Sequence, residues 1–312
     1  MRQKRILIIG GTGALGKTLV SKYYNDSEII VMSRDEHKHF HMKQIYPNVK
    51  YIVGDVRDKD SVINVLVRYN PEVVINAAAL KHVHICEENP WESVKTNIIG
   101  HQNVIEAVQQ YPVEHLIFVS TDKACKPINV YGMCKSISEQ LYVSFAKQQR
   151  DTKVVMVRYG NVLESTGSVI PYFKQLLEDG SDHLPITHFD MTRFLLTLDQ
   201  AVDLIGWAYG NDDSHGKIVV PKIKSLKVTD IANVLINSYE LDVKLKEIGI
   251  RPGEKLHEEM VSSEEWMRSN EFNNFFLIGS ENINEEQHSY NSLDYLMDSS
   301  DAYQFLKDSK VI

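Results

Sequence analysis

The sequence predicts an α/β fold: a doubly wound parallel sheet with helices on both faces, joined to a second, smaller α/β unit. Short apolar runs alternate with segments of helical periodicity through the first half of the chain, which favours parallel strands joined by helical crossovers. The runs are almost continuously apolar, as expected of strands that are buried on both faces. A glycine-rich turn follows the first run, and this position is typical of doubly wound sheets.

Six strands and five helices account for the regular part of the pattern. The strands are expected at Ile6–Ile9, Ile29–Met32, Lys50–Val53, Val73–Asn76, Leu116–Ser120 and Val154–Arg158, and the helices near 14–25, 35–45, 59–69, 91–109 and 130–148. Because crossovers between parallel strands are right-handed, these elements build a sheet of the Rossmann type. Prolines and loop-like stretches break the pattern after about residue 160. We therefore expect one unit at 1–162, to which segments near 190–210 can return, and a smaller unit at 163–312.

The composition excludes several classes of partner. Lys and Arg number 34 and Asp and Glu number 42, which gives a formal charge of −8 in a chain of 312 residues and argues against broad binding to nucleic acid or to an anionic membrane. No apolar run reaches the roughly 18 residues that a membrane span needs. The three cysteines, Cys86, Cys125 and Cys134, lack the spacing of a metal site. We therefore expect a cytoplasmic location, without disulfides or a bound metal.

The turn after the first strand has the composition of a phosphate-binding loop. Glycines lie at positions 10, 13 and 16, and a helix follows. This spacing allows a tight turn, a close approach of the backbone to a pyrophosphate and close packing of helix on strand. The helix N-terminus supplies N–H groups and a positive dipole end. We expect the unit at 1–162 to bind a dinucleotide through Gly10, Thr12, Gly13, Ala14, Leu15 and Gly16.

The end of the second strand indicates which dinucleotide binds. Ser33 is followed there by Arg34 and Asp35. An arginine suits the 2′-phosphate of NADP, whereas a carboxylate suits the ribose of NAD. We favour NADP, contacted by Ser33 and Arg34, over NAD. Asp55 and Val56 close the third strand and are placed to reach the adenine, with a helix cap as the alternative role for Asp55 or Asp58.

Polar residues after the fifth strand and on the next helix predict a catalytic site. The strand runs into Thr121, Asp122 and Lys123, at the edge where parallel sheets carry their chemistry. Tyr131 and Lys135 are four residues apart and share one helix face. A nearby ammonium lowers the pKa of a tyrosine, so Tyr131 would serve as a base toward a substrate alcohol held by Thr121. With the glycine loop, this pattern resembles the extended short-chain dehydrogenase/reductase superfamily.

Three further stretches narrow the resemblance. They are Asn76–Val83 after the fourth strand, Ser120–Ala124 after the fifth, and Arg158–Pro171, which enters the second unit. Over about residues 5–260 the chain resembles the soluble UDP-N-acetylglucosamine 4,6-dehydratases that invert sugar carbon 5. The resemblance implies cofactor contacts from Ala77, Ala78, Ala79, Lys81, Asn97, Tyr131 and Lys135.

The same resemblance implies a reaction. Hydride leaves carbon 4 for the nicotinamide while Tyr131 accepts the hydroxyl proton. Lys123, if deprotonated, removes the proton on carbon 5, and Asp122, if protonated, donates to the departing hydroxyl of carbon 6. Hydride returns to carbon 6 and carbon 5 is reprotonated from the other face, which gives UDP-2-acetamido-2,6-dideoxy-L-arabino-hexos-4-ulose for glycan synthesis. A simple ion pair or a cap is the alternative role for Asp122 and Lys123.

The second unit is expected to bind the substrate, UDP-N-acetylglucosamine. The resemblance implies substrate contacts from Lys81, Asn161, Ser168, Val169, Arg193, Arg251 and Glu254, with arginine for phosphate and glutamate for ribose. It also implies a homo-oligomer, a dimer or a dimer-based hexamer, paired through the helices near 91–109 and 130–148. A retaining dehydratase, a UDP-sugar 4-epimerase and a non-catalytic NADP-binding scaffold stay open as alternatives.

Overall fold

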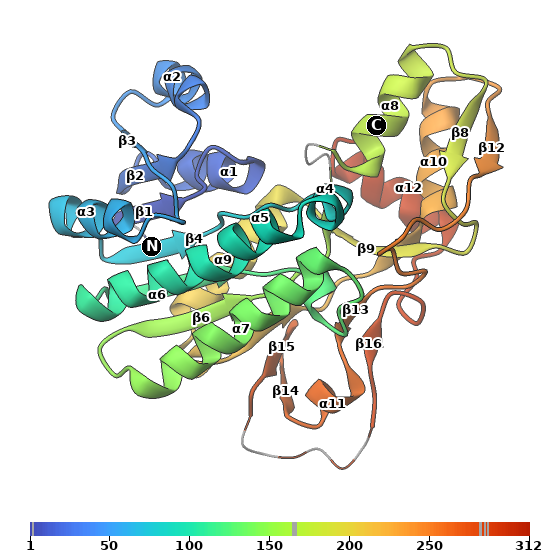
Figure 1. The fold of residues 1–312 in the computed structure, drawn as a ribbon. Helices are drawn as coiled ribbons and strands as arrows, with labels where there is room; N and C mark the ends of the chain where they lie inside the picture. Colours follow the sequence, from blue (N-terminus) through green and yellow to red (C-terminus); the bar gives the residue numbers. More distant parts are fainter. Residues whose placement is uncertain (2, 164–166, 281–282, 284, 286) are drawn as a thin grey trace.

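A parallel sheet forms the centre of the larger part of the molecule (Figure 1). The structure is a computed structural model that describes residues 1, 3–163, 167–280, 283, 285 and 287–312. Parallel strands from the first half of the chain follow the order β3-β2-β1-β4-β5-β6, which is the order of a Rossmann sheet. They are β1 (Arg5–Ile9), β2 (Glu28–Ser33), β3 (Lys50–Val53), β4 (Val73–Asn76), β5 (His115–Val119) and β6 (Lys153–Val157). The predicted doubly wound α/β fold is confirmed.

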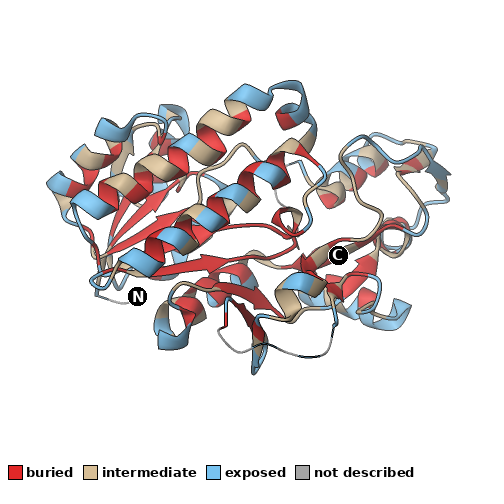
Figure 2. Ribbon diagram, turned by 60° about the horizontal axis from the view of Figure 1, so that its bottom comes forward, coloured by how far each residue is buried: buried red, intermediate tan, exposed pale blue. Residues whose placement is uncertain are grey.

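Alternate strand residues build a separate apolar core on each face of the sheet, and Figure 2 shows the strands of this sheet as buried, with helices beside them. Ile6 and Ile8 of β1 pack on one side, and Leu7 and Ile9 on the other. The first side carries α1 (Ala14–Tyr23), α2 (Glu36–Ile45) and α9 (Leu198–Gly210), and the second carries α3 (Lys59–Tyr69), α6 (Gly100–Gln110) and α7 (Val130–Gln148). Because successive strand side chains point to opposite faces, two covered faces require continuously apolar strands.

The large sheet continues beyond β6 with strands from late in the chain. β10 (Ile218–Pro221) pairs parallel with β6, and β15 (Phe275–Ile278) and β14 (Ser269–Phe272) follow antiparallel. α9 lies on the face that carries α1. The first unit is therefore not limited to residues 1–162, because segments from later in the chain return to its sheet. Residues 198–221 and 269–278 join the first unit, because their apolar side chains are buried against its two cores.

A smaller lobe, at the right of Figure 1, contains much of the second half of the chain. Helices α8 (Val169–Glu178), α10 (Val228–Ser238) and α12 (Ser299–Asp308) enclose a core of their own. The short strands are β7 (Asn161–Val162), β9 (Thr192–Leu196) and β11 (Ser225–Lys227) in one sheet, β8 (His183–Ile186) with β12 (Lys244–Glu247), and β13 (Glu259–Val261) with β16 (Tyr290–Asn291). The connections between them return to the carboxyl ends of the large sheet, where the candidate site lies.

The helix predicted near 91–109 is interrupted. Short helices α4 (Val83–Glu88) and α5 (Pro90–Val94) are followed by one π-helical turn, η1 (Lys95–Ile99), and only then by α6. Asn97 lies in this turn and is fully buried. Its Oδ1 accepts from Leu80 N (2.9 Å) and its Nδ2 donates to Leu80 O (2.8 Å). Single π turns are frequent at functional sites, and this one places an amide against the loop after β4.

Candidate active site

The glycine loop between β1 and α1 forms a tight cradle. Gly10 has φ = 83°, a left-handed conformation, and a Cβ on it would lie 2.8 Å from Ala78 N. A Cβ on Gly16 would lie 2.4 Å from Gly11 Cα. Gly13 is the N-cap of α1 and offers no side chain to the first N–H groups of the helix. Those groups and the positive helix end suit a phosphate, so the loop fits the pyrophosphate of a dinucleotide.

The end of β2 is joined to this cradle. Thr12 Oγ1 donates to Ser33 Oγ (3.1 Å), and Arg34 is exposed to solvent. Asp35 caps α2, where its carboxylate accepts from Lys38 N (3.1 Å) and lies 2.9 Å from Lys38 Nζ. These contacts with Lys38 lower the pKa of Asp35. The carboxylate that would favour NAD is therefore engaged by its own helix.

Asp55, at the end of β3, is held by a neighbouring arginine. Its Oδ2 accepts from Arg57 Nε (2.8 Å) and its Oδ1 from Arg57 N (3.0 Å). The side chain that caps α3 is Asp58, so Asp55 does not serve as the cap. Val56 is buried in the core. The adenine contacts expected of Asp55 and Val56 stay predictions.

The loop after β4 lies against the cradle. Ala77, Ala78 and Ala79 are half-buried, and the backbone of Ala78 closes on Gly10. Lys81 is exposed at the far end of the loop. Asn97 uses its amide to hold Leu80. Asn97 therefore orders the loop, while its expected contact with the cofactor stays a prediction.

Thr121, Asp122 and Lys123 form a cluster directly after β5, on the short turn η2 (Asp122–Ala124). Asp122 is completely buried. Thr121 Oγ1 donates to Asp122 Oδ1 (2.8 Å), and Lys123 Nζ donates to the same oxygen (3.1 Å). Tyr131, at the start of α7, is buried and forms a side-chain hydrogen bond with Thr121. The structure thus brings four of the five predicted catalytic side chains together.

Lys135, the fifth, lies one turn from Tyr131 but binds elsewhere. Its Nζ donates to Val119 O (2.7 Å) and lies 4.4 Å from the centre of the Phe118 ring. Burial lowers the pKa of Lys135 to about 7. Burial, together with the nearby Asp122 carboxylate, raises the pKa of Tyr131. The expected lowering of the Tyr131 pKa is therefore not found, because desolvation acts against the phenolate.

A carboxylate that the motifs did not single out completes the cluster. Glu258 is 2% exposed, and its Oε1 lies 3.4 Å from Lys123 Nζ. Burial opposes the charge of Lys123, but Asp122 and Glu258 outweigh it and raise its pKa. Burial also raises the pKa of Asp122; Lys123 opposes that rise and Glu258 adds to it. The resemblance points to Arg251 and Glu254 in the segment Arg251–Lys255, and the sequence carries no signal that distinguishes the buried Glu258 from the other glutamates that follow.

Four of the predicted substrate residues line one small cavity where β7, α8 and β9 meet. Its volume is about 20 Å³, and Asn161, Ser168, Val169 and Arg193 contribute to its wall. Among the described residues, Asn161 Oδ1 and Ser168 Oγ are buried without a hydrogen-bond partner, which is unusual unless such atoms meet water or a ligand. Residues 164–166, part of the same stretch of resemblance, lie outside the described residues.

Arg251 and Glu254 form a second group on a turn beside α7. Arg251 is exposed and its Nη1 lies 4.0 Å from Glu254 Oε1, while Glu254 Oε2 is buried and has no hydrogen-bond partner in the part of the chain that the structure describes. Asn129 Nδ2 donates to Gly253 O (2.7 Å) and so docks the turn on the start of α7.

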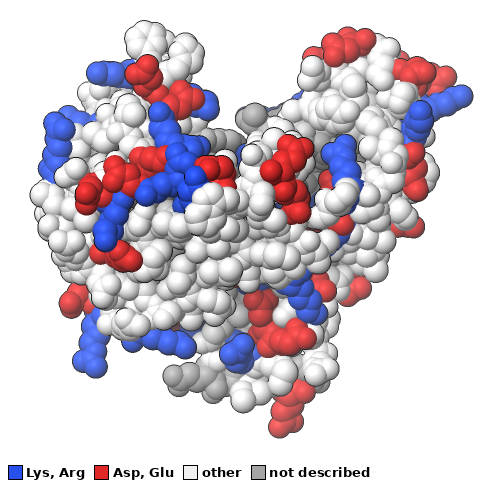
Figure 3. All heavy atoms as spheres, viewed as in Figure 1, with Lys and Arg blue, Asp and Glu red and all other residues white. Residues whose placement is uncertain are grey.

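In the view of Figure 3 the surface is hollowed between the part that carries α2 and the lobe that carries α8.

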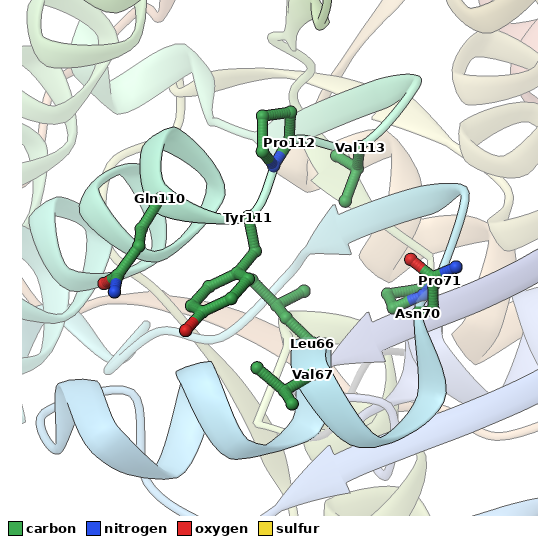
Figure 4. Close-up of a pocket in the computed structure, with 8 residues that line it drawn as sticks. All are labelled: Leu66, Val67, Asn70, Pro71, Gln110, Tyr111, Pro112 and Val113. Carbon is green, nitrogen blue, oxygen red and sulfur yellow. The ribbon is translucent and has the colours of Figure 1, made fainter.

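A wider hollow, of about 340 Å³, lies at the opposite edge of the sheet (Figure 4). It is lined by Leu66, Val67, Asn70, Pro71, Gln110, Tyr111, Pro112 and Val113. These residues precede β4 and β5, whereas ligands of open α/β sheets bind beyond the carboxyl ends of the strands. The lining also offers no carboxylate, histidine or lysine, so this hollow is not the candidate site.

The described part of the chain contains neither a membrane-spanning helix nor a cluster of metal-binding side chains. No helix there is long and apolar enough to cross a bilayer, and no three His, Cys, Asp or Glu side chains are grouped to hold a metal ion. The three cysteines are buried and unpaired.

Comparison with known proteins assigns the chain to a family. The sequence pattern of a family described as polysaccharide biosynthesis protein matches residues 6–280. The chain belongs to this family. The matched residues include the glycine loop, the cluster after β5 and the Arg251–Glu259 segment. The match therefore covers every part of the candidate site.

Two similar proteins of known name carry the names of two different sugar-nucleotide enzymes. A Campylobacter jejuni protein named UDP-N-acetylglucosamine 4,6-dehydratase (inverting) is 44% identical over 284 residues, which cover 88% of this chain and 83% of the relative. A UDP-glucose 4-epimerase of Rickettsia bellii is 38% identical over 287 residues, 88% of this chain and 82% of the relative. The resemblance to the inverting dehydratases is confirmed.

Solved structures agree with the fold of the family member. Pen from Bacillus thuringiensis superposes with a TM-score of 0.92 at 32% identity, over 100% of this chain and 99% of that chain. DesIV, a dTDP-glucose 4,6-dehydratase from Streptomyces venezuelae solved with NAD and TYD bound, gives a TM-score of 0.72 at 20% identity, over 81% and 86%. The latter similarity supports the fold alone.

Proposed function

We propose that this family member is an NADP-dependent UDP-N-acetylglucosamine 4,6-dehydratase that inverts carbon 5 and supplies a 4-keto-6-deoxy sugar for glycan synthesis. The cluster of Thr121, Asp122 and Lys123 beside Tyr131 carries the proposal. A 4-epimerase exchanges hydride and a hydroxyl proton at carbon 4. Elimination of water needs, in addition, a base for carbon 5 and an acid for the leaving hydroxyl. Asp122 and Lys123 provide that second pair, and the similarity to the C. jejuni dehydratase supports the same reaction.

The cradle and the end of β2 fit NADP. Gly10 allows the turn to pack against Ala78, Gly13 leaves the N-terminus of α1 without a side-chain cap and so suits a pyrophosphate, and the exposed Arg34 with the Ser33 hydroxyl suits a 2′-phosphate. Asp35 is already engaged by Lys38. When bound, the nicotinamide accepts a hydride from the sugar and later returns it. Ala77–Ala79 and Lys81, on the loop beside the cradle, are the further contacts we propose.

The protonation of Asp122 and Lys123 sets the order of events. Lys123 rests as an ammonium between two carboxylates and cannot take up a proton in that form. Transfer of one proton from Lys123 Nζ to Asp122 Oδ1, 3.1 Å away, produces an amine base and a carboxylic acid together. Burial and the Glu258 charge favour the protonated acid, since both raise the pKa of Asp122. The pair therefore shares one proton, and one of its two forms is ready for elimination.

The neutral form of the pair balances the elimination. Once carbon 4 is a ketone, the bond between carbon 5 and its proton breaks, the proton binds Lys123 Nζ and the electron pair enters an enolate. The enolate reforms the ketone as a double bond develops between carbons 5 and 6. The carbon 6 hydroxyl leaves with the proton of Asp122 as water. Hydride addition at carbon 6, which the bound nicotinamide would supply, would form the enolate again, and its reprotonation at carbon 5 from the opposite face would invert that carbon.

Tyr131 and Thr121 are placed to handle the proton of the carbon 4 hydroxyl. Because burial raises its pKa, Tyr131 rests as a neutral phenol hydrogen-bonded with Thr121. A phenol accepts a proton only after it has lost its own, so the oxidation step requires deprotonation of Tyr131. We therefore expect the rate of oxidation to rise with pH above neutrality.

Cations and unpartnered oxygens near the cluster suit a UDP-sugar. Arg193 and Arg251 supply positive charge for the diphosphate. Three buried oxygens, on Asn161, Ser168 and Glu254, have no hydrogen-bond partner within the described ranges and suit the hydroxyl and amide groups of the sugar and the ribose. We propose these five residues, with Val169 and Lys81 at the margin, as the substrate contacts.

We propose that two copies pair through α5 and α7. Trp91, Met133 and Ile137 on these neighbouring helices are 62%, 48% and 48% exposed. Apolar side chains exposed together in this way mark a protein interface. Val104, Val108 and Phe145, by contrast, are buried against the sheet. Sedimentation equilibrium should show a dimer or a dimer-based hexamer, and introduction of Ile137→Glu should release monomers.

An NMR experiment in deuterated water tests the activity. Purified protein with NADP and UDP-N-acetylglucosamine should produce a 6-deoxy methyl signal, a 4-ketone, and deuterium at carbon 5 with inverted coupling. Lys123→Ala should bind NADP but produce no methyl signal, and near-normal turnover in this variant would remove Lys123 from the chemistry. Retained coupling would identify a retaining dehydratase, and a 4-epimer without a methyl signal an epimerase. NADP binding without product from any UDP-sugar would indicate a scaffold.

A further inference from the structure

Glu258 lies against the catalytic lysine but comes from a distant part of the chain. Its backbone N–H donates to Ser292 Oγ (2.8 Å) and its carbonyl accepts from Ser292 N (2.8 Å), which fixes this segment in place just before β13. The side chain is 3% exposed, and its Oε1 lies 3.4 Å from Lys123 Nζ. A carboxylate buried to this degree needs a partner of opposite charge.

Charged groups from three elements face this carboxylate. Lys123 approaches from η2. Arg193, on β9, has its Nε 4.0 Å from Glu258 Oε1, and Lys255, on the segment that carries Glu258 itself, has its Nζ 3.9 Å from Glu258 Oε2. Arg193 and Lys255 also donate to backbone carbonyls, at 2.8 and 2.6 Å. Around Lys123 itself the charged groups are Asp122, Glu258 and, farther off, Arg193. Lys123 is therefore the closest ion partner of Glu258.

We propose that Glu258 is a positioning residue for the dehydration: its carboxylate holds Lys123 Nζ in place and stabilises the ammonium that forms when Lys123 takes the proton from carbon 5. This inference rests on the proposed function. Asp122 cannot supply the negative charge at that moment, because it is then the protonated acid. Among the described residues, Glu258 is the remaining carboxylate within 4.0 Å of Lys123 Nζ.

The step moves one proton and no other atom. The bond between carbon 5 and hydrogen breaks, a bond between Nζ and hydrogen forms, and the electron pair stays on the sugar as the enolate. A positive charge appears on Nζ, 3.4 Å from the Glu258 carboxylate and largely shielded from water, where the attraction between charges is strong. Glu258 thereby makes Lys123 a stronger base than its burial alone would allow.

Lysine titration by NMR tests this contact without catalysis. The protein is labelled with ¹³C at lysine Cε, and Lys123→Ala assigns the signal. Glu258→Gln keeps the size of the side chain and removes its charge, so the midpoint of Lys123 should fall by about one pH unit or more, a tenfold change in proton affinity. Glu259→Gln is the matched control, because that carboxylate pairs with Lys126 at 3.4 Å. A midpoint that does not move in Glu258→Gln overturns the proposal.

The pH dependence of product formation provides a second test. Glu258→Gln should form the methyl product roughly tenfold more slowly or worse, with its optimum moved to lower pH. Without the Glu258 charge, both protonation steps of the Asp122–Lys123 pair require more acid. Reduced nicotinamide should still appear in a single turnover, because oxidation at carbon 4 does not use Lys123. Glu258→Asp keeps the charge at a greater distance and should recover part of the rate.

The two tests separate the inference from the function beneath it. A uniform loss of rate in Glu258→Gln with the optimum of the wild type indicates a structural role and overturns the proposal. Wild-type protein that yields no product from UDP-N-acetylglucosamine contradicts the proposed function and with it the role in dehydration, and the lysine titration then tests only the ion pair of Glu258 with Lys123. Thermal unfolding and NADP binding of each variant establish that it is folded.

Discussion

Tyr131 and Lys135 lie one turn apart on α7, yet the Nζ of Lys135 is turned to the carbonyl oxygen of Val119, at 2.7 Å. Tyr131 instead forms its hydrogen bond with Thr121. Burial shifts the two groups in opposite directions, since it raises the pKa of Tyr131 and lowers that of Lys135 to about 7. At neutral pH the pair therefore consists of a neutral phenol and a lysine close to its midpoint.

Replacement of Tyr131 by phenylalanine should slow the oxidation of carbon 4. The variant loses the oxygen that receives the alcohol proton, and proton transfer of this kind contributes roughly 10²- to 10⁴-fold to a rate. Stopped-flow absorbance of the reduced nicotinamide measures the step. Tyr142→Phe is the control, because that buried hydroxyl accepts from Asn76 Nδ2 (3.0 Å). Wild-type rates in Tyr131→Phe would assign the proton to another group.

Lys135 should make the stability of the protein depend on pH above neutrality. Its folded pKa of about 7 lies below the ordinary value of 10.5, so between these values the unfolded chain binds more protons and stability rises with pH. The slope contributed is at most about 1.4 kcal/mol per pH unit. Lys135→Met should remove it in urea unfolding at pH 7 and pH 9, whereas Lys22→Met, at an exposed position, should not. A wild-type slope in Lys135→Met would contradict the burial effect.

Arg34 should determine the preference for NADP. Arg34→Ala removes the exposed cation at the end of β2, so the affinity for NADP should fall by about tenfold or more while that for NAD stays the same. Calorimetric titration with both cofactors measures the difference. Lys22→Ala changes an exposed cation of α1 that is paired with Asp203 and serves as the control. Equal losses for both cofactors, or none, would count against the NADP assignment.

Arg158 should be a main support of the fold. Its Nη2 lies 2.6 Å from both Glu139 Oε2 and Glu265 Oε1, with Arg158 and Glu139 each 1% exposed. Arg158→Met leaves two carboxylates without their cation and should lower the free energy of unfolding by about 3–5 kcal/mol. Urea unfolding measures this, and addition of Glu139→Gln should restore part of the loss. A loss below about 1 kcal/mol would show that water replaces the arginine.

Local patterns predicted the elements of the first half of the chain. The strand Arg5–Ile9 follows from its apolar run, and the helix Lys59–Tyr69 follows from its helical periodicity. Both signals are set by residues that are close in the sequence. The π turn at Lys95–Ile99 was not predicted from the sequence, because one inserted residue hardly alters the helical periodicity. The pairing of Phe275–Ile278 with the large sheet was not predicted either, since a short apolar run does not reveal which strand it pairs with.

By itself, the sequence determined the doubly wound sheet, the glycine cradle and the position of Thr121, Asp122 and Lys123 after the fifth strand, because backbone conformation and strand burial depend on neighbouring residues. The tertiary structure decided which charges meet. It placed Glu258 against Lys123, bonded Lys135 to the carbonyl of Val119 and buried Tyr131, and thereby set the direction of each pKa. Desolvation and ion pairing depend on contacts between distant segments, and spacing along the chain does not specify those contacts.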